Sequence, residues 1–339
     1  MELQLQEEGR PVITDFLTWT RENEYSIKES FLWSETETLK MFVHDTGILE
    51  VIPKVATDEQ IVYSAGIHGN ETAPLEILND IISDIHTGKQ PSVHHSLFIF
   101  GNPKAMNLGK RFVDENLNRL FARSLEDKPD NYDVRRAKVI IKHLETFYSD
   151  DSKKTHYDLH TAIRSSQLEK FAMYPFAPDE EIHMDQLYFL ADSGIQAVIF
   201  GHSPATTFSY HSKSLFKAKS FTLELGRVKG FGENDRTRFT KIENSLRKIL
   251  AGDYAPKKSI EGLKTFKIDF EILRTKEDFT FSFSESVPNF TQFEKDQLIA
   301  TDGEELILAQ TSDQRVLFPN TKVKIGERAA VIIGPKRLP

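Results

Sequence analysis

The fold is decided by the stretch Ile61-Val-Tyr-Ser-Ala-Gly-Ile67, which is followed at once by His68-Gly-Asn-Glu71. A short apolar run of this kind predicts a buried strand. From Pro74 onward apolar residues recur three or four positions apart, and Gly88 follows the last of them, which predicts an amphipathic helix. Strand, polar turn and helix in this order are typical of an α/β domain, whose binding loops lie beyond the carboxyl ends of the strands.

The same alternation continues from about residue 38 to residue 252. Further strands are expected at 39–43, 97–100, 155–159, 197–200 and 220–224. Further helices are expected at 134–147 and 240–250. The sequence therefore predicts an α/β fold with a mixed, mostly parallel sheet flanked by helices.

The pattern changes after Ala251-Gly-Asp-Tyr-Ala-Pro256, where long helical periodicity ends. Alternating runs such as Phe279-Thr-Phe-Ser-Phe283 are separated there by turn signals such as Asp302-Gly303. We therefore expect two domains, one over residues 1–255 and a smaller antiparallel β domain over residues 256–339.

Composition restricts the classes of function. The chain has 339 residues, of which 39% are hydrophobic and 28% charged, as in an ordinary globular protein. Its formal net charge of -8 argues against nucleic acid or an anionic membrane as the principal partner, so any small anionic substrate must be drawn in by a local basic patch. The absence of cysteine excludes disulfides, thiolate metal sites and a cysteine nucleophile. Residues 1–8 are acidic and no apolar run is long enough to span a bilayer, so we expect a cytoplasmic location.

His68 and Glu71 have the chemistry of half a zinc site. Zn²⁺ accepts imidazole nitrogen and carboxylate oxygen, and a tight turn permitted by Gly69 brings residues three apart to the same side. The alternative is coincidence, because a bare His-x-x-Glu is expected about once in a chain of this length and composition. Other ligands and a base are needed before the motif predicts a metal.

Two more candidates stand at the ends of predicted strands. In Tyr157-Asp-Leu-His160, residues two apart share a face, so Asp158 and His160 point together, and the Asp158 carboxylate is a candidate partner for a ligating imidazole such as that of His68. Glu224 is a charge in a strand that otherwise looks buried, which suits a general base beside a metal. The alternatives are a core-edge histidine and the exposed end of an edge strand.

Arginines follow another strand in the segment Gly109-Lys-Arg111, which continues to Asn118-Arg119-Leu-Phe121. Guanidinium groups bind carboxylates with two hydrogen bonds and stabilise a developing oxyanion. Arg164, four residues after His160, is a further candidate of the same kind. The alternative for each arginine is a solvated loop.

Taken in order, four motifs resemble the succinylglutamate desuccinylase and aspartoacylase family, which is related to the zinc carboxypeptidases. They are Gly66-Ile-His68-Gly-Asn-Glu71, Asn118-Arg119-Leu-Phe121, Asp158-Leu-His160-Thr-Ala and Leu223-Glu224-Leu-Gly226. The resemblance covers roughly residues 60 to 235, and it implies a carboxypeptidase-like α/β domain with a C-terminal β domain that narrows access to the site. One departure is Asn116, which stands where an Asp often precedes the Leu-Asn-Arg motif.

The resemblance implies a role for each matching residue. His68, Glu71 and His160 correspond to the ligands of one Zn²⁺ per chain, and Glu224 corresponds to the general base. In the basic segment, Arg111 corresponds to the residue that polarises the scissile carbonyl. The pair that holds a substrate carboxylate corresponds to Asn118 and Arg119, and Arg164 is a candidate for another carboxylate.

The flanks of the motifs look closest to the desuccinylase branch. The resemblance therefore implies hydrolysis of N-succinyl-L-glutamate to succinate and L-glutamate, the closing step of arginine breakdown through succinylated intermediates. The alternatives are an aspartoacylase-like deacylase of another N-acyl amino acid, and a zinc-stabilised binding protein without catalysis. Glu224 and Arg111 argue against the last of these, because a structural zinc site needs no base.

Overall fold

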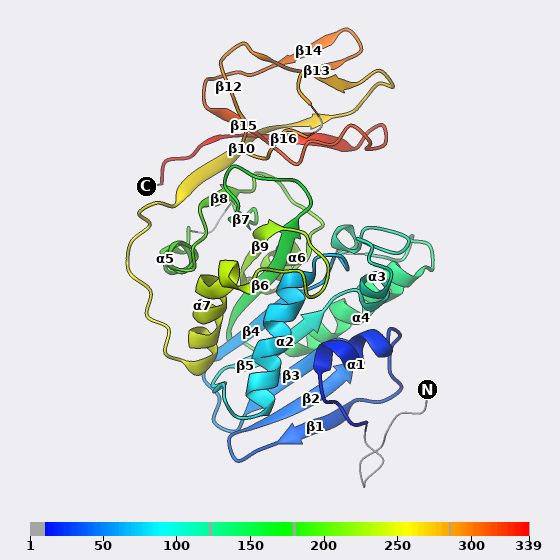
Figure 1. Ribbon diagram of the computed structural model, residues 1–339, viewed down its shortest axis with the longest axis vertical. Coiled ribbons are helices and arrows are strands. Elements are labelled where there is room, and N and C mark those ends of the chain that lie inside the picture. Colours follow the sequence, from blue (N-terminus) through cyan, green and yellow to red (C-terminus); the bar gives the residue numbers. More distant parts are fainter. Residues whose placement is uncertain (1–10, 122–123, 179–180, 285, 339) are drawn as a thin grey trace.

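The computed structural model describes residues 11–121, 124–178, 181–284 and 286–338. The acidic segment 1–8 singled out in the sequence lies outside the described residues. One large mixed sheet crosses the molecule, in the order β1-β2-β3-β5-β4-β6-β9-β7-β8-β10-β16-β15-β12 (Figure 1). A smaller sheet, β11-β13-β14, lies in the C-terminal region. None of the described helices has the length and apolar character needed to cross a membrane.

The centre of the large sheet is parallel. Its four strands are β5 (His95–Phe100), β4 (Glu59–Ala65), β6 (Lys153–Ala162) and β9 (Lys219–Arg227). Antiparallel strands continue one side, namely β3 (Ile48–Pro53), β2 (Leu39–Asp45) and β1 (Phe31–Glu35). The other side continues with β7 (Phe171–Tyr174), antiparallel to β9, and β8 (Ala197–Phe200), parallel to β7. Because the four central strands run the same way, their carboxyl ends meet at one edge.

Helices cover both faces of this sheet. One apolar core holds α1 (Phe16–Glu22), α2 (Thr72–His86), α5 (Met184–Asp192) and α7 (Thr240–Ala251), of which α2 and α7 lie in front of the strands in Figure 1. A second core holds the turn η1 (Leu117–Arg119), α4 (Tyr132–Phe147) and α6 (Phe208–Phe216). The remaining helical segments are α3 (Pro103–Asn107) and η2 (Arg236–Phe239).

The C-terminal region extends the same sheet. Strand β10 (Lys264–Leu273) pairs in parallel with β8, from Lys264 opposite Ala197 to Lys267 opposite Phe200. Beyond it follow β16 (Arg328–Pro335), β15 (Gln314–Leu317) and β12 (Gln292–Phe293), and the small sheet is formed by β11 (Thr280–Phe281), β13 (Leu298–Asp302) and β14 (Glu305–Leu308). Backbone hydrogen bonds thus connect the C-terminal strands directly to the strands of the α/β region.

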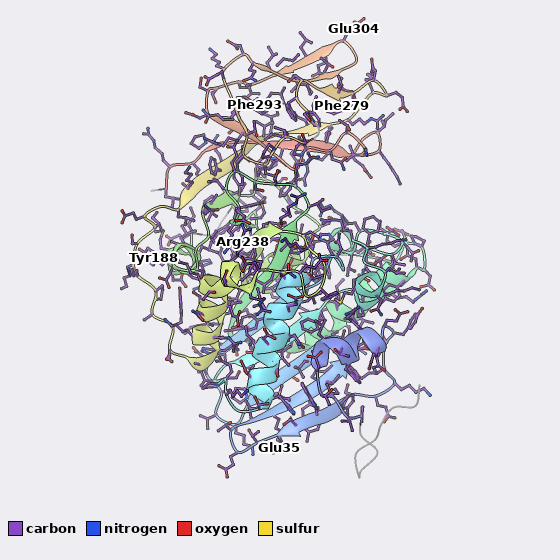
Figure 2. The ribbon with its side chains drawn as sticks, viewed as in Figure 1. Glu35, Tyr188, Arg238, Phe279, Phe293 and Glu304 are labelled. Carbon is purple, nitrogen blue, oxygen red and sulfur yellow. The ribbon has the colours of Figure 1, made fainter. Side chains whose placement is uncertain are left out.

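Aromatic rings fill the C-terminal core. Phe279 meets Phe281 edge to face at 5.0 Å, and Phe281 stacks on Phe283 at 4.7 Å between ring centroids. Figure 2 places Phe279 and Phe293 inside this region and Glu304 at its outer tip. The alternating pattern at 279–283 predicts a strand, and in the structure its phenylalanines pack in this core. The strand itself, β11, covers only Thr280 and Phe281 of this segment.

The predicted α/β class with a smaller C-terminal antiparallel sheet is confirmed. The predicted helices from Pro74 to just before Gly88, at 134–147 and at 240–250 correspond to α2, α4 and α7 within a few residues. Strands β1, β3 and β7 and helices α3, α5 and α6 were not predicted. The three helices have only 5 to 9 residues, too few to show a long apolar period.

A polar cluster lies on the sheet away from the carboxyl edge. Glu50 on β3 contacts His44 Nε2 on β2 at 2.5 Å and His95 Nε2 on β5 at 2.6 Å. Burial raises the pKa of Glu50, but hydrogen bonds from the two histidines outweigh it and lower this pKa to about 2. This carboxylate therefore ties three neighbouring strands together through their side chains.

Candidate metal and catalytic site

A tight turn carries the first two candidate ligands from β4 into α2. Gly66 starts it with φ of 67°, where an L residue is strained. Gly69 does not have a positive φ; a Cβ there would lie 2.4 Å from both the carbonyl carbon of Ala105 and the nitrogen of Met106. The turn thus needs Gly69 because it packs against the backbone of α3, rather than for the conformational freedom expected from the sequence.

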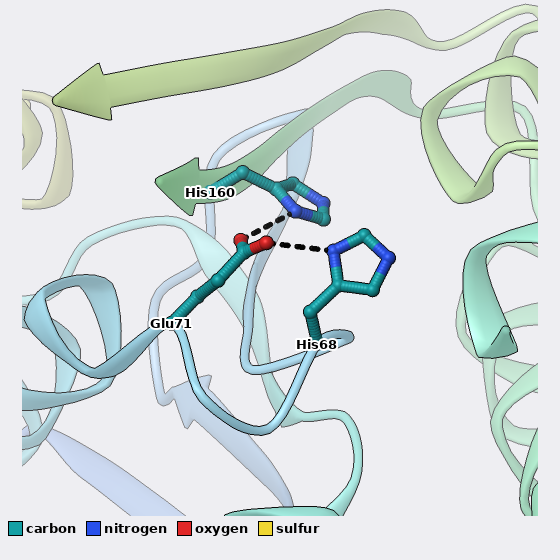
Figure 3. A group of neighbouring side chains, drawn as sticks. All are labelled: His68, Glu71 and His160. Atoms are coloured by element: carbon teal, nitrogen blue, oxygen red, sulfur yellow. Dashed lines mark hydrogen bonds and ion pairs between the residues drawn. The ribbon is translucent and has the colours of Figure 1, made fainter. Parts of the chain in front are cut away.

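The carboxylate of Glu71 faces two neighbouring imidazole rings (Figure 3). Its Oε1 is 2.8 Å from His68 Nδ1 and its Oε2 is 2.9 Å from His160 Nδ1. All three side chains are buried. The backbone N–H of Thr161 also donates to Oε2, at 2.9 Å, which fixes the carboxylate against the end of β6. The structure therefore brings together the two residues of the turn and the histidine predicted from a distant strand.

The proton on the His68 ring can be assigned from its neighbours. Asn116 Oδ1 accepts the backbone N–H of Asn118 at 3.1 Å, which identifies this atom as the amide oxygen. The same oxygen lies 3.0 Å from His68 Nε2, so Nε2 must be the donor. Burial lowers the pKa of His68 to about 4, so the ring is neutral and Nδ1 carries a lone pair. The residue Asn116, noted in the sequence only as a departure, thus orients the His68 ring.

The His160 ring is held from its other nitrogen. Asp158 Oδ2 accepts from His160 Nε2 at 2.9 Å, which leaves Nδ1 facing Glu71. The predicted hydrogen bond between Asp158 and a candidate ligand imidazole is present, but the ring is that of His160 and not that of His68, because residues two apart on a strand share a face. A carboxylate on the far nitrogen is the usual support of a metal-bound histidine.

These atoms fit a metal ion. His68 Nδ1 is buried and has no hydrogen-bond partner among the described residues, although a carboxylate oxygen lies 2.8 Å away. A lone pair facing an anionic oxygen is repulsive unless a cation lies between them. Within the described part of the chain, His68, Glu71 and His160 form the one cluster whose ligand atoms all lie within 4.8 Å of one another. This buried group therefore has the donors and spacing to hold a metal.

Glu224 lies beside this cluster on the adjacent strand. The parallel register of β6 and β9 places it directly opposite His160. Its Oε2 is buried without a hydrogen bond to any described residue. Burial and the negative charge of Glu71 raise the pKa of Glu224 to about 7. Glu224 therefore has a buried carboxylate oxygen without a hydrogen bond to any described residue, as a proton-transfer group requires.

The basic segment reaches the same edge. Arg111 Nη1 donates to Glu71 Oε1 at 2.7 Å. Asn118 is buried, and its Oδ1 accepts the N–H of Phe208 at the start of α6. This hydrogen bond uses the amide oxygen of Asn118 and not its N–H₂ group. Desolvation by the surrounding protein, together with the charges of Arg328 and Arg111, lowers the pKa of Arg119 to about 10. The crowding of cations here favours an anionic ligand.

Arg164 has a different neighbour. Its Nη2 donates to the carbonyl oxygen of Pro319 at 2.5 Å, a contact between the segment after β6 and the segment after β15. The role of Arg164 in binding a substrate carboxylate stays a prediction.

Curated relatives match almost the whole chain. The succinylglutamate desuccinylase of Idiomarina loihiensis is 42% identical over 330 residues, covering 95% of this chain and 96% of the relative. That of Pseudoalteromonas atlantica is 40% identical over 342 residues, covering 98% and 96%. The crystal structure of the Vibrio parahaemolyticus enzyme superposes with a TM-score of 0.89 at 33% identity, covering 96% of each chain.

Two family models match consecutive parts of the chain. Residues 57–250 match the succinylglutamate desuccinylase/aspartoacylase catalytic domain, which contains every candidate site residue. Residues 261–336 match the AstE/AspA barrel-sandwich hybrid domain. The resemblance first suggested by four short motifs thus extends over both domains, and the chain belongs to the succinylglutamate desuccinylase/aspartoacylase family.

Proposed function

We propose that this protein is a zinc-dependent amidohydrolase that cleaves N-succinyl-L-glutamate to succinate and L-glutamate. One observation carries the proposal: the uncommitted Glu224 carboxylate lies directly across from His160 in a buried cluster that can hold a metal. The desuccinylase names of relatives at 42% and 40% identity support the choice of substrate. The reaction would close a route of arginine breakdown through succinylated intermediates, in the cytoplasm.

The donor set favours zinc. Two imidazole nitrogens and one carboxylate, without cysteine, are a common three-ligand set for catalytic zinc, and they leave a coordination position for water or substrate. When bound by His68, Glu71 and His160, one zinc ion per chain would act as a Lewis acid and lower the pKa of water. The support for His68 and His160 from Asn116 and Asp158 is what such a site needs to keep both rings in one orientation.

Glu224 would move the proton. A pKa near 7 allows a carboxylate to accept a proton from the attacking water and then to deliver it to the departing glutamate nitrogen. Its Oε2 makes no hydrogen bond to a described residue that would have to be broken before it accepts that proton. This carboxylate is therefore suited to act first as general base and then as general acid.

The arginines would bind charge on the substrate. N-succinyl-L-glutamate carries three carboxylates, so a protein with a net charge of -8 needs a local group of cations to bind it. Arg111 has further N–H groups beyond the one on Glu71 and would polarise the scissile carbonyl, while Asn118 and Arg119 would hold one carboxylate. Arg164 would hold a second carboxylate of the substrate.

The test is a hydrolysis assay of the purified protein on succinylglutamate and on acetylaspartate, with and without a chelator. We expect turnover of succinylglutamate that chelator abolishes and zinc restores. Preferential turnover of acetylaspartate would instead support an aspartoacylase-like deacylase. Zinc bound at one ion per chain without turnover of either compound would refute the proposal.

A second experiment isolates the base. Glu224→Gln should keep its zinc and lose roughly 10²- to 10⁴-fold in kcat, which is the usual contribution of a general acid-base group. Glu277→Gln, the same substitution at an exposed side chain, is the matched control and should leave kcat unchanged. A Glu224→Gln enzyme with a near-wild-type rate would remove Glu224 from the mechanism.

A further inference from the structure

A chain of buried polar side chains continues behind His160. His156, four residues earlier on β6, lies 2.8 Å from Ser64 Oγ through its Nε2 and 2.8 Å from Ser212 Oγ through its Nδ1. Ser64, on β4, also lies 2.6 Å from Asp158 Oδ1. Ser64, His156, Asp158 and Ser212 have no exposed surface, and none of them reaches the cluster of candidate ligands except through Asp158.

The direction of each hydrogen bond follows from counting protons. The hydroxyl of Ser64 lies 2.6 Å from Asp158 Oδ1 and donates to this carboxylate oxygen. The single hydroxyl proton of Ser64 is therefore donated to Asp158, and the contact between Ser64 and His156 must be a donation from His156 Nε2. Burial lowers the pKa of His156 to about 4, so its ring is neutral and Nδ1 accepts from the hydroxyl of Ser212.

Asp158 is consequently fixed through both oxygens. Oδ1 accepts from Ser64 at 2.6 Å, and Oδ2 accepts from His160 Nε2 at 2.9 Å. A carboxylate held at Oδ1 cannot rotate without breaking a buried hydrogen bond, which leaves an unsatisfied group in the core. With a proton required on His160 Nε2, the nitrogen available to a metal is Nδ1, the one that faces Glu71.

We propose that Ser212, His156 and Ser64 act as positioning residues, which orient Asp158 and through it fix His160 as the Nε2–H tautomer that presents Nδ1 to the metal. The inference rests on the proposed function, because it takes His160 as a metal ligand. All three side chains are fully buried and so have no exposed surface with which to touch a substrate. Hydrogen bonds that point the same way along a buried chain strengthen one another, so removing a distant member weakens the bond to Asp158.

The site also depends on α6 in a second way. This helix supplies Ser212 to the chain, and its first N–H, at Phe208, binds Asn118 Oδ1 at 2.9 Å. One helix therefore supports both the metal side and the carboxylate-binding side of the site.

The first test is zinc affinity, measured by competition with a chromophoric chelator. Ser64→Ala and His156→Phe should each weaken zinc binding about tenfold, the lower end of the effect of removing support from a ligating histidine. His156→Gln should restore affinity to within about threefold, because its amide N–H₂ replaces the donor toward Ser64. Ser209→Ala is the matched control: Ser209 is another buried serine of α6, paired with Thr222 at 2.7 Å, and its loss should leave zinc affinity unchanged.

The second test needs no metal. In the zinc-free protein labelled with ¹⁵N-histidine, His156 should show the Nε2–H tautomer of a neutral ring. A proton on Nδ1, or a cationic ring, at about pH 7 would overturn the direction of the chain and with it the inference. This measurement reports on the tautomer itself, which a merely space-filling role of His156 would not determine.

The outcomes separate the two proposals. A wild-type protein that binds zinc and hydrolyses substrate, but whose Ser64→Ala and His156→Phe variants bind zinc equally well, would overturn this inference alone. A wild-type protein that binds no zinc would overturn both. If His156→Phe does not fold, Ser64→Ala and the histidine spectra decide the question.

Discussion

The substitution Gly69→Ala tests whether close packing of the ligand turn against α3 positions the site. The new Cβ would lie 2.4 Å from two backbone atoms, the carbonyl carbon of Ala105 and the nitrogen of Met106. Non-bonded carbon atoms prefer about 3.5–4.0 Å, so the turn or the helix must move by roughly 1 Å. Backbone atoms cannot rotate away as a flexible side chain can, and overpacking of this kind costs about 1–3 kcal/mol in the free energy of unfolding.

The displacement should reach the ligands as well. His68 and Glu71 flank Gly69, and a shift of about 1 Å in reacting groups lowers rates on the order of 10²-fold. We expect Gly69→Ala to unfold at lower urea concentration, to bind zinc at least roughly tenfold more weakly and to lose most of its activity. The measurements are urea denaturation, chelator competition and the hydrolysis assay.

The control is Gly88→Ala, at the other end of the helix that begins after Glu71. Gly88 has φ of 77° with no atom within 4 Å of an added Cβ. The Gly88→Ala variant should lose about 1–2 kcal/mol in the free energy of unfolding through backbone strain, and its zinc affinity should be unchanged. If Gly69→Ala matches the wild type in zinc affinity, the close approach to α3 does not position the ligands and the reasoning fails.

Three further predictions concern other parts of the chain. The depressed pKa of Glu50 should contribute about 3 kcal/mol to the free energy of unfolding above pH 4.5, and this contribution is lost as the pH falls toward 2. In urea denaturation, Glu50→Gln should therefore be less stable than the wild type at about pH 6 and equally stable at low pH. The same substitution at exposed Glu35 should change the free energy of unfolding little. Arg136 is buried and donates to the carbonyls of Phe100 and Gly101 at 2.9 and 2.6 Å, so Arg136→Met should cost about 2–4 kcal/mol, measured in the same way, and unchanged stability would contradict this. Arg119→Met should lower kcat/KM about 10- to 100-fold, mainly through KM, and an unchanged KM would remove Arg119 from substrate binding.

The long elements and the site residues near them were predictable from the sequence. Helices α2 and α4 have a regular apolar face over 15 and 16 residues, so periodicity alone indicates them. The turn that carries Glu71 follows the apolar strand β4, and His160 lies near the carboxyl end of β6, so strand direction brings both to one edge. Local pattern and topology are enough at these positions.

The hydrogen bonds that orient the candidate ligands could not be predicted from the sequence. His68 meets Asn116 across 48 positions, and His156 meets Ser212 across 56. Serine, asparagine and neutral histidine are common in loops and cores, and nothing in their local spacing distinguishes a supporting partner from a bystander. The sequence signal for Asn116 was its departure from an expected Asp, and only the folded arrangement gives that amide an acceptor role toward His68.

The pairing of β8 with β10 matters for anyone who truncates or recombines this gene. A chain that stops near residue 255 would lack β10 and would leave β8, the wholly buried apolar strand Ala197-Val-Ile-Phe200, as an open sheet edge. Unpaired apolar edges recruit other chains, so such a truncation should aggregate rather than yield a minimal hydrolase. Chimeras between relatives should therefore take β8 and β10 from the same parent, so that the two strands keep the side chains with which they pack.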